Sequence, residues 1–104
     1  MIYVKMHESD DGDILAMCDE SLIDKTLSEG EMFIDVKGYS DFYTGELVDA
    51  TNYELPRLDE VISFNIIGEE SVGFCVRNSI IDIDNVKVIE GVPFAHAYKV
   101  DKPK

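Results

Sequence analysis

The chain has few positive charges and no basic cluster. Of its 104 residues, nine are Lys or Arg and 22 are Asp or Glu, so its formal net charge is −13. Only two arginines occur, Arg57 and Arg77. Because tight binding to phosphate backbones relies on clustered Lys and Arg, the sequence argues against autonomous binding to DNA or RNA. We expect the acidic surface to attract cations or a basic protein partner instead.

Long apolar runs and paired cysteine motifs are also missing. No run approaches the roughly 20 apolar residues that cross a bilayer, and the first residues, MIYVKMHESDD, lack the apolar core of a signal peptide. Cys18 and Cys75 stand far apart, so they form no C-x-x-C motif. Both lie in apolar segments, which is typical of reduced, buried thiols. These absences predict a cytosolic protein without membrane contact.

Alternating apolar and polar residues predict an N-terminal β-hairpin. Ile2, Val4 and Met6 occupy alternate positions, and the pair Asp11-Gly12 is favoured at the centre of a tight turn. The segment ILAMC predicts a returning strand that is buried on both faces. Farther along, periodicity predicts a helix over 68–79, turns at 82–85 and 90–93, and strands over 32–36, 61–67, 86–89 and 94–100.

The segment between the hairpin and residue 31 predicts a short helix. Asp19 stands where an N-cap would be, apolar residues follow at helical spacing over 22–27, and Gly30 is a suitable stop. This interpretation explains the segment MCDESLIDKTLSEGE by secondary structure alone and requires no reactive group. The alternative is a reactive Cys18 activated by the helix N-terminus, although the neighbouring carboxylates raise a thiol pKa.

Residues 37–56 predict an ordered loop, since they combine glycines, Asn52, Pro56 and several aromatic residues. Phe42 and Tyr43 either pin this loop to the core or form an exposed contact surface. Pro56 suits the first turn of a short helix, or else the chain runs directly into the strand at 61–67.

Strands and short helices mix along the chain, and the first hairpin is antiparallel, so the predicted class is α+β. We expect a single domain over residues 1–100 and a frayed tail at 101–104. The domain should hold a mixed sheet with the N-terminal hairpin and two or three short helices.

Groups that could carry chemistry are sparse. His7 and His96 would converge only if the two end strands pair, and they match no ligand signature. The carboxylates in SDDGDI and DIDN lack the spacing of a calcium loop. Asn65 and Gly68 mark a strand–glycine–helix corner of the kind that binds anions, but Glu69 and Glu70 would repel phosphate. We therefore expect no metal site and no cofactor.

The order of the motifs resembles a small archaeal family indexed as the domain of unknown function number four hundred and twenty-four. The resemblance runs from Tyr3 to about Lys99, and its most specific pieces are Cys18-Asp19-Glu20, Phe42-Tyr43 with Gly45-Glu46, Asn65 with Gly68-Glu69, and Gly91-Val92-Pro93. It implies an archaeal, cytosolic, single-domain protein with no established activity, and translation as the associated process. This chain departs from the family pattern at Asp24, where glycine is usual, and at Phe94, where histidine is usual.

Three functions follow from these observations. The first is a non-catalytic interaction module whose contact surface includes Phe42, Tyr43, Gly45 and Glu46, beside Asn65, Gly68, Glu69 and Pro93. Its acidic field would steer a basic protein such as a translation factor or ribosomal protein. The second is a small enzyme with Cys18 as nucleophile and Asp19 or Glu46 moving protons. The third is a binder of divalent cations. The sequence favours the interaction module.

Overall fold

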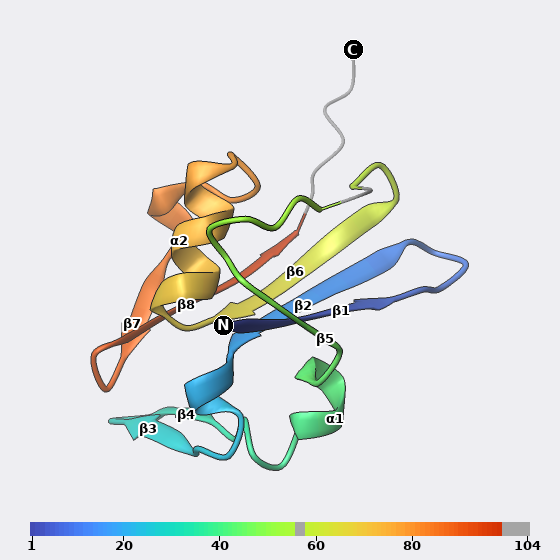
Figure 1. Ribbon diagram of the computed structural model, residues 1–104. Helices are drawn as coiled ribbons and strands as arrows, with labels where there is room; N and C mark the ends of the chain where they lie inside the picture. The colour runs from blue at the N-terminus through green and yellow to red at the C-terminus, as the bar shows by residue number, and fades with distance from the viewer. Residues whose placement is uncertain (56–57, 99–104) are drawn as a thin grey trace.

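The main structural feature is a mixed six-stranded sheet in the order β5-β1-β2-β6-β8-β7 (Figure 1). The computed structural model describes residues 1–55 and 58–98. The sheet consists of β1 (Ile2–His7), β2 (Asp13–Asp19), β5 (Glu46–Val48), β6 (Val61–Ile67), β7 (Lys87–Ile89) and β8 (Val92–Tyr98). The remaining elements are the hairpin β3 (Leu27–Glu29) and β4 (Met32–Ile34), the helices α1 (Ser40–Tyr43) and α2 (Glu69–Arg77), and the 3-10 turns η1 (Glu20–Leu22) and η2 (Ile83–Asn85).

The central pair β2 and β6 is parallel, whereas the other neighbouring strands of this sheet run antiparallel. A parallel pair needs a crossover, and here residues 20–60 provide it. This arrangement confirms the predicted α+β class, the mixed sheet and the N-terminal antiparallel hairpin. Within the described ranges, no helix is long and apolar enough to cross a membrane.

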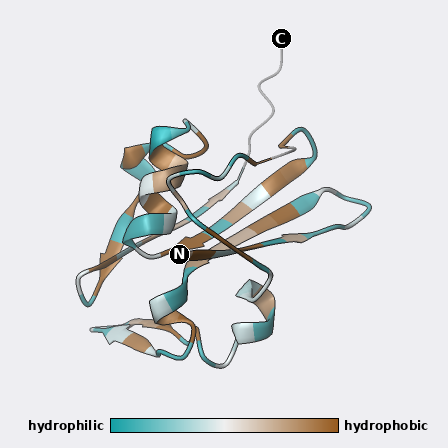
Figure 2. Cartoon of the chain, viewed as in Figure 1, coloured by the Kyte–Doolittle hydropathy of each residue, from teal (hydrophilic) through white to brown (hydrophobic). Residues whose placement is uncertain are grey.

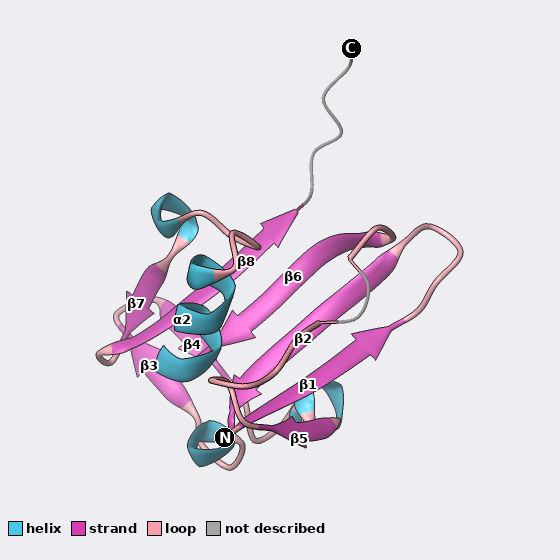
Figure 3. Cartoon of the chain, turned by 45° about the horizontal axis from the view of Figure 1, so that its top comes forward, coloured by secondary structure: helices cyan, strands magenta, loops and turns pink. Residues whose placement is uncertain are grey.

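The sheet is covered on both faces, and each face has its own apolar core. One core lies under α2 and joins Leu15 and Met17 to Phe74. The other lies under α1 and the β3–β4 hairpin and joins Cys18 to Tyr43 and other apolar residues. Figure 3 shows α2 crossing one side of the sheet, with α1 behind β1. Hydrophobic residues run along β2 and β6 (Figure 2), as a strand buried on both faces requires.

The predicted hairpin is confirmed, but its turn is wider than a two-residue turn. Pairing between β1 and β2 ends at His7 and Ile14, and the loop lies between these residues. Gly12 has a φ of +131°, and a Cβ at this position would lie 2.4 Å from the side chain of Ile62. The close approach of Ile62, at a register shift between β2 and β6, therefore requires glycine here.

The helix predicted after Asp19 is wrong. Only the 3-10 turn η1 forms, and residues 27–34 make the β3–β4 hairpin. Gly30, predicted to stop a helix, lies in the hairpin turn with a φ of +61°. The apolar residues of this stretch face the second core instead: Leu22 and Ile23 pack against it, and Leu27 lies in it opposite Ile34. A three-residue strand is too short for its period to show in the sequence.

The prediction of an ordered loop over 37–56 is also corrected, because α1 and β5 lie within it. β5 is held by pairing with β1, a long-range contact that local composition does not reveal. Among the alternatives for 55–62, the chain runs into β6, which begins at Val61. The helical role of Pro56 and the tail at 101–104 lie outside the described residues.

The other predicted elements are confirmed with small shifts. The helix over 68–79 is α2, the turn at 82–85 is η2, and the strand over 86–89 is β7. β4 ends at Ile34 rather than at residue 36. The turn at 90–93 is shorter than expected, because β8 begins at Val92. Glu90 and Gly91 both have positive φ, as a two-residue hairpin turn of type I′ requires.

Candidate functional site

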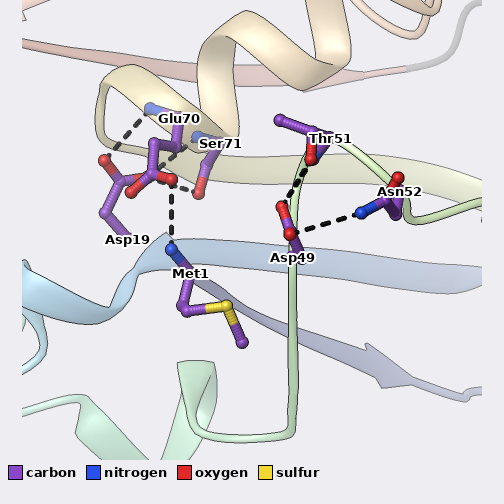
Figure 4. Close-up of polar contacts among 7 residues, drawn as sticks. All are labelled: Met1, Asp19, Asp49, Thr51, Asn52, Glu70 and Ser71. Atoms are coloured by element: carbon purple, nitrogen blue, oxygen red, sulfur yellow. Dashed lines mark hydrogen bonds and ion pairs between the residues drawn. The ribbon is translucent and has the colours of Figure 1, made fainter.

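The ends of the parallel strands β2 and β6 form a corner at the N-terminus of α2. Asp19 is the last residue of β2, and its side chain is only 6% exposed. Its carboxylate accepts hydrogen bonds from the backbone N–H of Glu70 at 3.1 Å and of Ser71 at 2.8 Å, and from the Ser71 hydroxyl at 2.8 Å (Figure 4). Asp19 therefore caps α2, which lies 50 residues farther along the chain, rather than a helix of its own.

Gly68 makes room for this carboxylate. Its φ is +111°, and a Cβ built on it would lie 2.2 Å from Cγ of Asp19. The Gly68 N–H donates to the carbonyl of Pro93 at 2.8 Å, which ties β8 to the same corner. Glycine is thus required both for the backbone conformation and for the space.

The corner that the sequence marked as an anion site is filled by the protein itself. The donors at the start of α2 point at Asp19, and the exposed carboxylate of Glu70 accepts from the Met1 amino group at 3.1 Å. Glu69 is exposed beside them. With these N–H groups already satisfied by an internal carboxylate, a second anion would meet only repulsion here.

Cys18 lies one residue before Asp19 and is fully buried. It belongs to the second core together with Tyr43 and Ile67. Burial raises the pKa of the Cys18 thiol to about 12, and the negative charge of Asp19 adds to the rise. Burial also raises the pKa of Cys75 to about 12. Because the thiolate is the nucleophile, this environment opposes the proposed catalytic role of Cys18.

We predict that both thiols resist labelling in the native protein at neutral pH. A thiol reagent should modify them only after unfolding in denaturant, since each side chain is inaccessible and protonated. A denaturant series at pH 7 that follows labelling by mass spectrometry measures this. Rapid modification of Cys18 in the folded state would revive the enzyme hypothesis.

The same pKa shifts predict that the folded protein loses stability at alkaline pH. The folded pKa of each thiol, about 12, lies above its ordinary value of 9.0, so the protonated form is favoured by folding. Their contribution to stability is therefore complete below pH 9.0 and is lost as the pH rises toward about 12. Urea unfolding across this range should show a falling midpoint.

Phe42 and Tyr43 hold α1 against the sheet rather than forming an exposed surface. Tyr43 is 6% exposed, and the Phe42 ring stacks on the His7 ring with a centroid distance of 4.3 Å. Nε2 of His7 lies 2.8 Å from the Phe42 carbonyl oxygen. Gly45 lies against β1, since a Cβ on it would be 2.2 Å from the Val4 carbonyl oxygen. The structure thus favours the first of the two interpretations of these aromatic residues.

Other predicted site residues lie apart from the corner. Glu46 starts β5 and pairs with Val4 at the edge of the sheet. Asn65 lies in the middle of β6, directly opposite His96 of β8. The structure therefore brings together Cys18, Asp19, Gly68, Glu69 and Pro93, and separates them from Glu46 and from Asn65.

The two histidines do not converge. β2 and β6 lie between β1 and β8, so His7 and His96 are three strand spacings apart. At about 4.8 Å per spacing, that is roughly 14 Å across the sheet, too far for a shared metal ion. Burial, together with the charge of Lys87, lowers the pKa of His96 below its ordinary value of 6.5. Among the described residues, no group of three or more His, Cys, Asp or Glu could hold a metal.

Sequence reasoning missed an acidic pocket at the opposite end of the sheet. The loop between β1 and β2 and the residues leading into β6 line an open depression of about 400 Å³. Its wall carries Asp10, Asp11 and Asp59, and its apolar part includes Ile62. Taken alone, the SDDGDI segment indicates only a turn or an imperfect calcium loop. The pairing of β2 with β6, which brings Asp59 to it, leaves no mark in the local pattern.

Comparison with known proteins gives a family and a fold. A model for the family described as "Protein of unknown function (DUF424)" matches residues 7–100. The chain is also similar to the crystal structure of an uncharacterized conserved protein from Methanopyrus kandleri. The TM-score is 0.75 at 22% sequence identity, over 99% of this chain and 95% of that one. No curated protein matches the sequence.

Proposed function

The chain belongs to the DUF424 family, whose function is unknown. We propose that it is a non-catalytic module that binds a basic protein through its acidic surface. The resemblance noted from the sequence is confirmed by the family match, and it brings no activity with it. We place the module in the cytosol, and its partner among the basic proteins associated with translation.

The acidic pocket is the observation that carries this proposal. Asp10, Asp11 and Asp59 line its wall, and among the described residues no Lys or Arg does. Exposed Ile62 adds an apolar contact beside the carboxylates. Such a surface suits a Lys or Arg side chain with its aliphatic stem, since the stem can cover Ile62 while the charge meets the aspartates.

The overall negative charge of the chain also favours a basic partner. The formal net charge is −13, and among the described Asp and Glu residues only Asp19 is buried. The field around the module therefore favours the approach of cations, which raises the rate of association with a basic partner and makes it depend on salt. The burial of both thiols weighs against the alternative of a cysteine enzyme.

We expect a synthetic peptide rich in Lys and Arg to bind the pocket. Replacing the carboxylates of the pocket with amides should weaken this binding. The triple variant Asp10→Asn/Asp11→Asn/Asp59→Asn should lower the affinity about tenfold at moderate ionic strength, because exposed ion pairs contribute from a few tenths to about 1 kcal/mol each. Fluorescence anisotropy of the labelled peptide, measured as a function of salt, gives both affinities.

A matched control separates this pocket from the general field. The variant Asp24→Asn/Glu31→Gln/Asp84→Asn removes the same formal charge from exposed positions outside the pocket. Its affinity should remain near that of the native protein. Equal losses in the two variants would contradict the assignment to the pocket, and no binding to the native protein at low salt would refute the proposed function.

A further inference from the structure

Two adjoining depressions lie on the face of the sheet that α2 covers. They have volumes of about 360 Å³ and 260 Å³ and share Leu58 and Ile80 in their walls. The segment after β5, which crosses the sheet beside α2 (Figure 1), forms one side, and the end of α2 with β6 and β8 forms the other. We call the two depressions together the α2 groove. Its apolar wall consists of Leu55, Leu58, Phe64, Phe74, Ile80 and Ala97.

The α2 groove exposes apolar surface that continues the core. Phe64 and Phe74 are buried members of the core under α2 and form the floor of the groove. Leu55, Leu58 and Ile80 pack against the same core but are only partly buried. Apolar side chains that stay partly exposed around a depression are typical of a surface that a partner covers.

The wall formed by Ile80 is held in place by the end of α2. The Ile80 N–H donates to the Cys75 carbonyl at 2.8 Å, and the Ser79 N–H donates to the Val76 carbonyl at 3.1 Å. Ser79 has a φ of +56°, so the helix ends in a Schellman motif. A partner therefore meets a wall that is already ordered, which lowers the entropic cost of binding.

Carboxylates stand at the rim of the groove. Glu54 lines one depression and Asp82 the other, and both are exposed. Neither forms an ion pair with a described residue, and no Lys or Arg from the described part of the chain lines either depression. Arg77 lines a further depression beyond Glu54. The positive charges of a partner should therefore lie toward Asp82 and away from Arg77.

A tight turn joins the groove to the acidic pocket. Leu58 lines the groove, whereas the next residue, Asp59, lines the acidic pocket together with Ile62. The Val61 N–H donates to the Leu58 carbonyl at 3.2 Å, so residues 58–61 turn back on themselves. A single segment of a partner can therefore contact the apolar groove and the aspartates of the pocket at once.

These features together specify the chemistry of the occupant. Both depressions are open to solvent, whereas a small-molecule site usually buries most of its ligand. On the basis of the proposed function, we propose that the α2 groove receives aliphatic side chains from the same basic protein. The Lys and Arg residues next to those side chains in the partner's sequence would meet Asp82 and the acidic pocket.

The test compares two synthetic peptides of equal length and equal Lys and Arg content. One carries two leucines between its basic residues, and the other has serines in their place. Each is titrated into the isotope-labelled full-length protein at physiological ionic strength and followed by NMR. We expect the leucine peptide to bind about tenfold more tightly, because its apolar side chains leave water, and to shift Leu58, Phe64 and Ile80. The ratio of the two affinities should persist at raised salt, since salt screens only the charges.

A pair of matched variants locates the preference for leucine. Leu58→Gln, in the groove, should remove most of it. Leu47→Gln should keep it, because Leu47 is 41% exposed on β5, at one edge of the sheet, and lines neither depression. Circular dichroism checks that both variants are folded, and the comparison of the two peptides on the native protein depends on neither variant.

The outcomes separate this proposal from the proposed function. Equal affinities of the two peptides would overturn the role of the groove and leave the acidic module standing. Failure of both peptides to bind at low salt would refute the proposed function and the groove with it. A leucine preference that leaves the groove residues unshifted, or that Leu47→Gln removes as fully as Leu58→Gln, would also overturn the proposal. So would a dimer, detected by sedimentation, whose dissociation on dilution shifts these same residues, since the occupant would then be a second copy.

Discussion

Replacing Asp19 with alanine is expected to lower the free energy of unfolding by about 3 kcal/mol, because hydrogen bonds to a buried charged group are strong and the groups left unpaired lose their partner. The carboxylate accepts three hydrogen bonds at the start of α2, two from backbone N–H groups and one from the Ser71 hydroxyl. Ser71 is fully buried, so water does not readily replace the missing acceptor.

Urea unfolding followed by circular dichroism measures the effect, with Asp24→Ala as the control. Asp24 is exposed and lies five residues from Asp19. Its replacement should change the free energy by no more than about 0.5 kcal/mol, as is usual for surface positions. A loss for Asp19→Ala no larger than that of Asp24→Ala would show that the Asp19 carboxylate does not cap α2.

Gly68→Ala is expected to cost about 3 to 4 kcal/mol, since overpacking and a positive-φ backbone that is nearly restricted to glycine each contribute about 1 to 3 kcal/mol. The new Cβ would lie 2.2 Å from Cγ of Asp19 while φ stays at +111°. Gly91→Ala provides the comparison. Gly91 also has a positive φ, of +77°, but nothing lies within 4 Å of the place that its Cβ would take. That variant should therefore show only the backbone cost, about 1 kcal/mol.

A double-mutant cycle isolates the contact between the two residues. In Asp19→Ala/Gly68→Ala the clashing carboxylate is gone, so the combined loss should fall short of the sum of the single losses by about 1 to 2 kcal/mol. Strict additivity would mean that the side chain of Asp19 does not occupy the space over Gly68.

Apart from the three-residue strands β4 and β7, the elements that the sequence predicted correctly have long, regular patterns. The alternation in β1, the apolar run of β2 and the helical stripe of α2 each extend over six or more residues. The elements that it missed, β3, β5 and α1, have three or four residues each. Such short elements exist because tertiary contacts hold them, so their local sequence carries little signal.

At the candidate site, too, the sequence predicts local features but not the tertiary contacts between them. The residue type and position of Asp19 correctly predict a helix cap, but they indicate the wrong helix, because the parallel pairing of β2 and β6 brings α2 to it. The opposition of Asn65 and His96 depends on the register of β6 and β8. Strand order also separates the two histidines. Residue chemistry could be predicted from the sequence, whereas these juxtapositions depend on topology.

We propose that this molecule binds basic proteins through its negative field. The most direct measurement titrates the purified protein, at physiological ionic strength, against a labelled Lys- and Arg-rich peptide and a labelled single-stranded RNA of equal length. We expect saturable peptide binding that weakens as salt rises, and no comparable binding of the RNA. Tight RNA binding by the protein alone, with the peptide left unbound, would contradict it.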